Sequence, residues 1–107
     1  MRRGEVWWAE LPPPAGRRPV LLLSRDRAYR VRTSVTIAVI TRTIREIPVE
    51  VPLGPEDGMP AACVVNVDDI LTVPKSVLKD RVTVLSANKM EAVASAIRFA
   101  LDLPGPD

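Results

Sequence analysis

Two consecutive arginines, Arg17 and Arg18, stand before a proline and an unbroken apolar run, residues 19–24 (PVLLLS). Four branched aliphatic residues between a proline and a serine predict a strand that is buried on both faces, with Pro19 tolerated at its first position. A guanidinium at the rigid edge of a strand is held in place, and its planar fork matches the oxygens of a phosphodiester. The pattern therefore indicates a phosphate-binding edge; the alternative is a pair of solvated charges in front of a core strand.

The charge of the chain is unevenly distributed, although the net charge is only +2. Residues 1–50 contain ten arginines and five acidic residues, whereas residues 51–107 contain five basic and eight acidic residues. Twelve of the fifteen basic residues are arginine, which favours bidentate phosphate contacts and stacking on bases, although high genomic GC content would produce the same bias. We therefore expect the first half to face a polyanion.

The sequence contains no histidine and a single cysteine, Cys63. The lack of imidazole excludes Ser-His and Cys-His nucleophilic catalysis, a histidine acid and base pair, and histidine metal ligands. One cysteine cannot form an internal disulfide or a thiolate cluster, and its apolar neighbours predict a buried strand residue. We expect neither a metal nor a cofactor.

Length and composition predict one domain over residues 1–107, because an apolar fraction of 47% is enough to fill one core. No apolar stretch approaches the roughly 18 residues of a membrane span. The first five residues lead into Trp7 and Trp8 without the apolar core of a signal peptide. We therefore expect a cytoplasmic protein with no membrane partner.

Short strands must position the arginines. Alternating or continuous apolar residues predict strands at residues 5–11, 20–23, 34–41, 47–53, 62–67, 70–73 and 82–85. The first two should be neighbours across a stiff proline loop, and Pro48 and Pro52 make residues 47–53 an edge or bulged strand. Residues 25–32 are a polar connection with at most one helical turn. Many short strands with brief turns favour a small barrel over a parallel sheet.

The apolar spacing changes after Leu85. Ser86 is a favourable N-cap, and a helical stripe follows it, made of Met90, Val93, Ala94, Ile97 and Leu101. Pro104-Gly105-Pro106 should end this helix, which we expect to pack on the barrel.

Trp7 and Trp8 point to opposite faces of the first strand. One indole is expected in the core, and the other on a solvent or ligand face, where it could stack on an unpaired base. Trp7 is our candidate for base stacking, with Trp8 as the alternative.

Several segments resemble, in the same order, the MazF/PemK family of toxin endoribonucleases. They are residues 3–11 (RGEVWWAEL), 18–24 (RPVLLLS), 38–41 (AVIT), 63–66 (CVVN) and 70–75 (ILTVPK), followed by a strand, Leu85-Ser86 and a C-terminal helix. The resemblance implies a mainly β fold, an SH3-like barrel of about five to seven strands with helices. It also implies a homodimer, neutralised by a cognate antitoxin, that cleaves single-stranded RNA, mRNA above all, without a metal. The expected ends are a 2′,3′-cyclic phosphate and a 5′-hydroxyl.

The resemblance assigns the catalytic pair to Arg18 and Thr41. A 2′-hydroxyl that attacks its neighbouring phosphate adds negative charge to the phosphoryl oxygens, and a fixed guanidinium stabilises that charge. Arginine keeps its proton at neutral pH, so its role is electrostatic. Thr41 can donate to a nonbridging oxygen or orient the 2′-hydroxyl; the alternative is a strand-end threonine selected for its β-branching.

The first loop departs from the family pattern. Residues 12–17 (PPPAGR) stand where the family usually has a Gly-Ser-Glu-Gln-like segment, so the loop serine and glutamate are missing. Which group takes the 2′-hydroxyl proton stays open: Glu10 and Asp26 are candidates, or ordinary surface carboxylates. Further RNA contacts are expected from four residues near the pair: Arg17, Arg42, Thr43 and Arg45.

Two other functions remain open on these residues. One is a non-enzymatic toxin of the same barrel type that poisons a protein such as DNA gyrase. The other is a nucleic-acid-binding module that has lost catalysis. The antitoxin that the resemblance implies should use a flexible acidic or apolar segment that folds over the basic groove.

Overall fold

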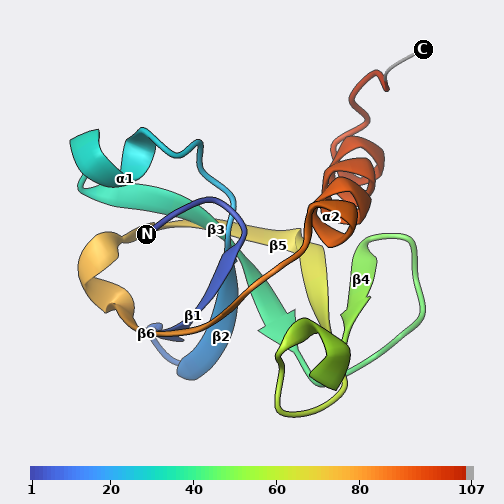
Figure 1. Cartoon of the computed structure of the whole chain (residues 1–107), viewed down its shortest axis with the longest axis horizontal. Helices are drawn as coiled ribbons and strands as arrows, with labels where there is room; N and C mark the ends of the chain where they lie inside the picture. Colours follow the sequence, from blue (N-terminus) through green and yellow to red (C-terminus); the bar gives the residue numbers. More distant parts are fainter. Residues whose placement is uncertain (106–107) are drawn as a thin grey trace.

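The structure, a computed structural model, describes residues 1–105. Six strands form one antiparallel sheet in the order β4-β5-β3-β2-β1-β6, which curls into a half-barrel (Figure 1). The strands are β1 (Glu5–Glu10), β2 (Arg17–Leu22), β3 (Ser34–Thr41), β4 (Glu50–Leu53), β5 (Cys63–Pro74) and β6 (Leu78–Val84). The helices are α1 (Ala28–Val31) and α2 (Ala87–Ala100), with short 3-10 turns η1 (Pro55–Asp57) and η2 (Lys75–Val77). The expected mainly β fold with a C-terminal helix is confirmed.

The edge strands β4 and β6 are linked through the η1 turn and α2 rather than through a ladder. Thr83 Oγ1 on β6 donates a hydrogen bond to the backbone oxygen of Asp57 at 2.9 Å. Lys89 Nζ on α2 donates to the backbone oxygen of Pro52 at 2.8 Å and lies 3.6 Å from the Asp57 carboxylate. This arrangement leaves the barrel incomplete, and the segment that follows η1 lines its open side.

The central strands β2 and β3 are buried on both faces, as the apolar run predicted. Leu21 and Ile40 face a core cluster that α2 covers, whereas Val20 and Ile37 face a second cluster that includes Tyr29 of α1. β2 begins at Arg17, so Pro19 is its third residue rather than its first. The proline is tolerated because the ladder to β3 starts at Val20, and Pro19 pairs with Trp8 of β1.

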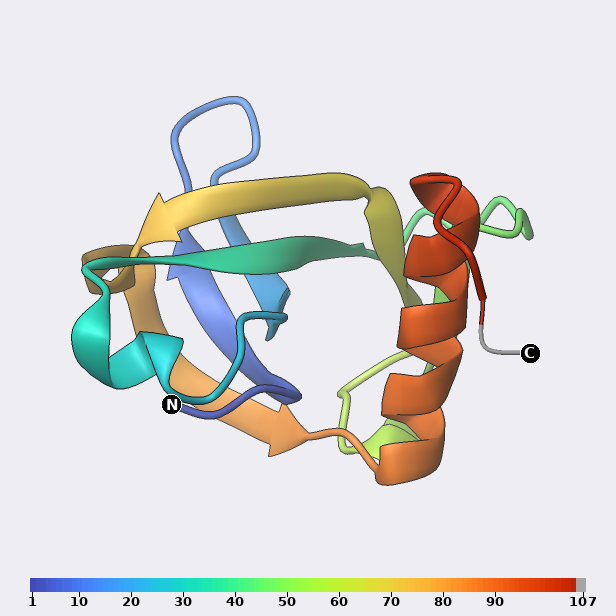
Figure 2. The ribbon, with the colours of Figure 1, turned by 90° about the horizontal axis from the view of Figure 1, so that it is seen from above.

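β5 is one long strand where the sequence predicted two. Across the β3–β5 ladder, Ile70 lies opposite Ala38 and Asn66 lies opposite Val39, so residues 67–69 form a bulge between consecutive pairs. The strand bends sharply beside α2 (Figure 2). The turn-like residues in the middle of β5 therefore bulge the strand without ending it.

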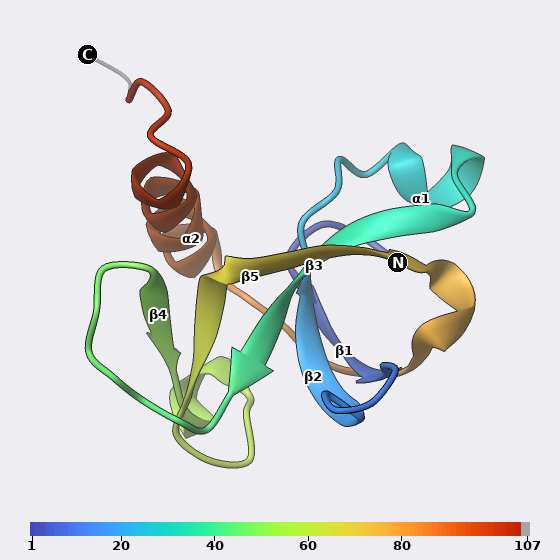
Figure 3. The same cartoon turned by 180° about the vertical axis from the view of Figure 1, so that it is seen from behind.

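The other strands differ from the sequence prediction at most in where they begin or end. β4 is an edge strand as expected but starts at Glu50 instead of residue 47, and β6 starts at Leu78 because it pairs with β1 from that point. Figure 3 shows α2 beside β4 and β5, at the end of the sheet away from α1.

Helix α2 begins at its predicted cap, where Ser86 Oγ accepts a hydrogen bond from the Lys89 backbone at 3.1 Å. Val93 and Ala96 are its buried residues. The expectation for Leu101 is wrong: the helix ends at Ala100, and Leu101 is 56% exposed. Pro106 lies outside the described residues. Between residues 1 and 105, no helix is long and apolar enough to cross a membrane.

Candidate active site

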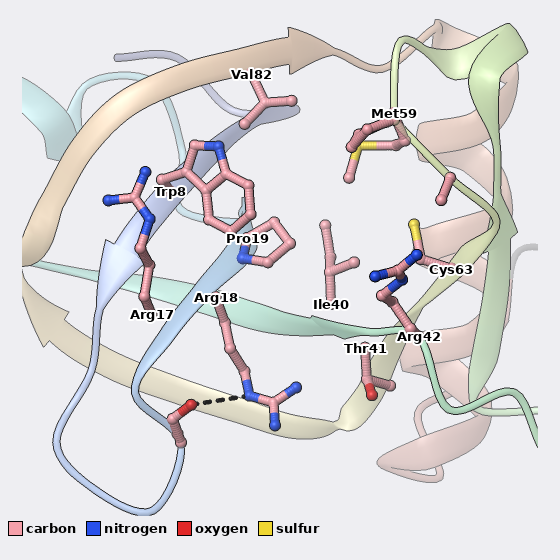
Figure 4. Close-up of a pocket in the computed structure, with 13 residues that line it drawn as sticks. Trp8, Arg17, Arg18, Pro19, Ile40, Thr41, Arg42, Met59, Cys63 and Val82 are labelled. Atoms are coloured by element: carbon pink, nitrogen blue, oxygen red, sulfur yellow. Dashed lines mark hydrogen bonds between the residues drawn. The ribbon is translucent and has the colours of Figure 1, made fainter.

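Arg18 and Thr41 lie at adjacent ends of β2 and β3. Val20 and Val39 are paired across these strands; Arg18 is two residues before Val20, and Thr41 is two residues after Val39. Because side chains alternate along a strand, both project from the face of that pair. Figure 4 shows the guanidinium and the threonine hydroxyl on the same side of the site. The sheet therefore brings together the two residues expected to be catalytic.

Backbone contacts hold both side chains. Arg18 Nε donates a hydrogen bond to the backbone oxygen of Ala15 at 3.1 Å, which fixes the plane of the guanidinium (Figure 4). Thr41 Oγ1 accepts a hydrogen bond from the Thr43 backbone N–H at 3.2 Å. The Thr41 hydroxyl still has its own proton to donate, which suits a nonbridging phosphate oxygen.

An apolar pocket of about 480 Å³ opens on one side of the pair. Its walls are mainly apolar side chains, and arginines stand at its rim; the lining includes Trp8, Arg17, Pro19, Ile40, Arg42, Met59, Cys63 and Val82 as well as Arg18 and Thr41. This pocket lies at the open side of the half-barrel, and its volume is within the range of small-ligand sites. Burial raises the pKa of Cys63, and the Asp57 carboxylate acts in the same direction. The thiol is therefore neutral and forms part of the apolar lining of the pocket.

A polar pocket of about 450 Å³ lies on the other side of the pair. Its polar lining consists of Arg18, Thr41, Arg45, Asn66 and Asp69. Asn66 Oδ1 accepts a hydrogen bond from the Asp68 backbone N–H at 2.9 Å, and this contact braces the β5 bulge. The Arg18 and Thr41 side chains thus stand between an apolar and a polar pocket.

The two tryptophans take different roles. Trp8 lines the apolar pocket, and the Arg17 guanidinium stacks on it with 4.8 Å between Cζ and the ring centroid. Trp7 does not line that pocket: it packs against the core, and its Nε1 donates a hydrogen bond to Glu5 Oε1 at 2.9 Å. Burial raises the pKa of Glu5, but hydrogen bonds from Trp7 and Arg2, with the nearby Arg81, bring that pKa below its usual value.

The matched substitutions Trp8→Leu and Trp7→Leu should separate these roles. Loss of the Trp8 ring should weaken binding of single-stranded RNA about 5- to 150-fold, because stacking on one base contributes about 1–3 kcal/mol. Trp7→Leu should leave that affinity unchanged but lower the urea midpoint of unfolding, because the Glu5 carboxylate loses a partner. Fluorescence anisotropy with a 2′-O-methyl RNA, which cannot form the cyclic phosphate, measures the affinity. Equal losses of affinity in the two variants would contradict the assignment.

The other predicted RNA-binding residues are spread around the pair. Arg42 lines the apolar pocket and Arg45 lines the polar pocket, whereas Thr43 is exposed and lines neither. The position of Arg45 depends on Glu50, whose buried Oε1 accepts hydrogen bonds from the backbone N–H groups of Arg45 at 2.8 Å and Glu46 at 2.9 Å.

The two carboxylates considered as proton acceptors are not in the pockets of the pair. Glu10 is paired with Arg17 in the β1–β2 ladder, next to the pair of Ala9 with Arg18, and Asp26 accepts a hydrogen bond from the Arg3 backbone at 2.7 Å. Neither lines a pocket that contains Arg18 and Thr41. The sequence interpretation instead missed Asn66 and Asp69, whose only signal was a polar interruption of an apolar strand.

The described residues thus form a small domain, a half-barrel that holds a fixed arginine and a threonine between two pockets. The chain belongs to the family of PemK-like, MazF-like toxins of type II toxin-antitoxin systems, which matches residues 2–101. The family predicted from the sequence is confirmed.

Similar proteins agree with this assignment. The chain is 41% identical to "Probable endoribonuclease MazF5" of Mycobacterium tuberculosis, over 94% of this chain and 92% of the relative. It is similar to the solved structure of the M. tuberculosis toxin MazF-mt6, with a TM-score of 0.87, 35% identity and coverage of 94% of this chain and 99% of that one. A mycobacterial endoribonuclease solved in complex with its cognate antitoxin has a TM-score of 0.86 and 31% identity over 99% of both chains.

Proposed function

We propose that this protein is the toxin of a toxin–antitoxin pair, an endoribonuclease that cleaves single-stranded RNA, with mRNA as its main substrate. The observation that carries the proposal is the placement of Arg18 and Thr41 side by side between the apolar and the polar pocket. The endoribonucleases among its relatives support the same activity.

The reaction we propose is an internal transesterification. The 2′-oxygen attacks the adjacent phosphorus and the bond to the 5′-oxygen breaks, which leaves a 2′,3′-cyclic phosphate and a 5′-hydroxyl. The Arg18 guanidinium, held by the Ala15 carbonyl, binds the phosphoryl oxygens as their negative charge grows. The Thr41 hydroxyl donates to one of them. Because the fixed guanidinium supplies the positive charge, we expect cleavage to need no metal or cofactor.

The surroundings of the pair suit an extended RNA strand. Trp8 offers a ring face to a base in the apolar pocket, and Arg17, Arg42 and Arg45 flank the path of the backbone. Thr43 contributes its backbone N–H to Thr41, and contact of its side chain with RNA stays a prediction.

We further propose a cytoplasmic homodimer that a cognate antitoxin inhibits. An acidic or apolar antitoxin segment would complement the apolar pocket and its arginine rim, and would compete with RNA for Trp8 and Arg17. Apolar side chains at the end of α2 and beyond it, including Phe99 and Leu101, are exposed and available to a second copy. Light scattering measures the mass in solution and should give that of two chains. A competition assay should show that the antitoxin displaces bound RNA.

Incubation with a long single-stranded RNA in excess EDTA tests the activity. We expect discrete cuts whose new 5′ ends accept a kinase label without phosphatase treatment, because a 5′-hydroxyl is the leaving group. Intact RNA in the presence of folded protein would contradict the proposal. Salt-dependent RNA binding without cleavage would then indicate a binding module, and absence of binding would favour a protein target.

A further inference from the structure

The proposed transesterification needs a proton acceptor that neither residue of the pair supplies. The attacking 2′-hydroxyl must lose its proton, and a side chain within hydrogen-bond reach does this best. A guanidinium is a hydrogen-bond donor with no acceptor atom, and Thr41 already accepts the Thr43 backbone N–H. This inference therefore rests on the proposed function and concerns the missing base.

Asp69 is the carboxylate that the fold brings to the pair. Of the described residues that line the two pockets containing Arg18 and Thr41, Asp69 is the only one with a carboxylate. Its side chain shares the polar pocket with two guanidiniums, those of Arg18 and Arg45. These cations offset the repulsion between a carboxylate and a phosphate placed in the same pocket.

The β5 bulge explains why Asp69 faces this pocket. Asn66 lies opposite Val39, two residues from Thr41, and the next pair joins Ala38 to Ile70. The residues between these pairs are displaced from regular alternation: Val67 is buried in the core, and Asp69 lines the pocket. Bulges commonly re-aim a side chain beside an active site. The Asn66 side chain holds this one through the Asp68 backbone.

We propose that the Asp69 carboxylate is the general base of the cleavage reaction. Asp69 takes the proton of the 2′-hydroxyl, and the electron pair of that O–H bond forms the new bond from the 2′-oxygen to phosphorus. The bond between phosphorus and the 5′-oxygen breaks, and its electron pair leaves on the 5′-oxygen, which takes a proton from water. Arg18 and Thr41 stabilise the phosphoryl oxygens during both changes.

Asp69→Asn tests this role, and Asp68→Asn is its matched control, since both remove one exposed negative charge from the same bulge. We expect Asp69→Asn to lower the single-turnover rate about 10²- to 10⁴-fold, the usual contribution of a general base, with RNA affinity within about threefold of wild type. Asp68→Asn should cleave at about the wild-type rate. The rise of the rate with pH on the acidic side should disappear only in Asp69→Asn. Formate should restore part of the rate of Asp69→Ala.

Any other result of these experiments would contradict the assignment of Asp69 as the general base, and each result would indicate a different explanation. Wild-type rates in Asp69→Asn would remove Asp69 from the mechanism, while the proposed ribonuclease would stand. Full rates at altered sequences would make Asp69 a base-reading residue instead. Loss of activity in both Asn variants would indicate a general charge or bulge effect. If the wild-type protein cleaves no RNA, the proposed function and this role fall together.

Discussion

Arg18→Ala is expected to lower the rate of RNA cleavage about 10³-fold or more, the range observed when an arginine that stabilises phosphoryl transfer is removed. The reason is that Arg18 is the guanidinium which β2 and the Ala15 carbonyl hold beside Thr41. The fold should survive, because the hydrogen bond that is lost contributes only about 1 kcal/mol at a half-buried site. Single-turnover kinetics in EDTA measures the rate, and thermal unfolding checks the fold.

Two further variants separate the catalytic role of Arg18 from a simple effect of positive charge. Arg18→Lys keeps the charge but loses the planar fork and the Nε–H donor, so it should restore only a small part of the activity. Arg17→Ala should weaken RNA binding and reduce the dependence of log affinity on log salt by about one unit, while cleavage at saturating RNA continues. An Arg18→Ala protein that turns over RNA as fast as wild type would exclude Arg18 from the reaction.

Gly58→Ala is expected to lower the free energy of unfolding by about 2–4 kcal/mol, the sum of backbone strain, a steric clash and a damaged hydrogen bond. Gly58 has a φ of 88°, and a Cβ there would lie 2.3 Å from Thr83 Oγ1. That hydroxyl is the group that ties β6 to Asp57. The substitution should therefore weaken the hydrogen bond between Thr83 and Asp57, which links the two edges of the half-barrel. The midpoint of urea unfolding measures the loss.

Gly16→Ala is the matched control for Gly58→Ala. Gly16 also has a positive φ, 66°, but beyond the glycine itself and its two chain neighbours no heavy atom of residues 1–105 lies within 4 Å of an added Cβ. The control should cost only about 1–2 kcal/mol of backbone strain. Equal losses in the two variants would show that the contact with Thr83 does not stabilise the fold.

Local patterns predicted several elements well. β3 runs over residues 34–41 as expected, because its apolar residues alternate with Thr36 and then run unbroken from Ile37 to Ile40, and polar residues bound it on both sides. The Ser86 cap and the start of α2 are also local, since the side chain bonds within its own first turn. The end of the helix was predicted less well: Leu101 has the right spacing, but no other element among the described residues covers it.

The chemistry available to this protein follows from its residue types and their order alone. The sequence contains no imidazole, and it places Arg18 before a core strand and Thr41 at the end of another. Its segments that resemble the family occur in the same order as in the family, and this order identifies it. These properties depend on residue type, on order and on the two-residue period of a strand, all of which are local.

Which side chains meet at the pair of Arg18 and Thr41 depends on contacts between distant segments and could not be read from the sequence. Trp8 rather than Trp7 reaches the apolar pocket because β1 pairs with β2 in a register that puts Trp8 opposite Pro19. Asp69 reaches the polar pocket because β5 bulges against β3, a ladder between segments about thirty residues apart. Alternation divides residues between two faces, but the distant segments that pack on each face decide which of them is buried and which lines a site.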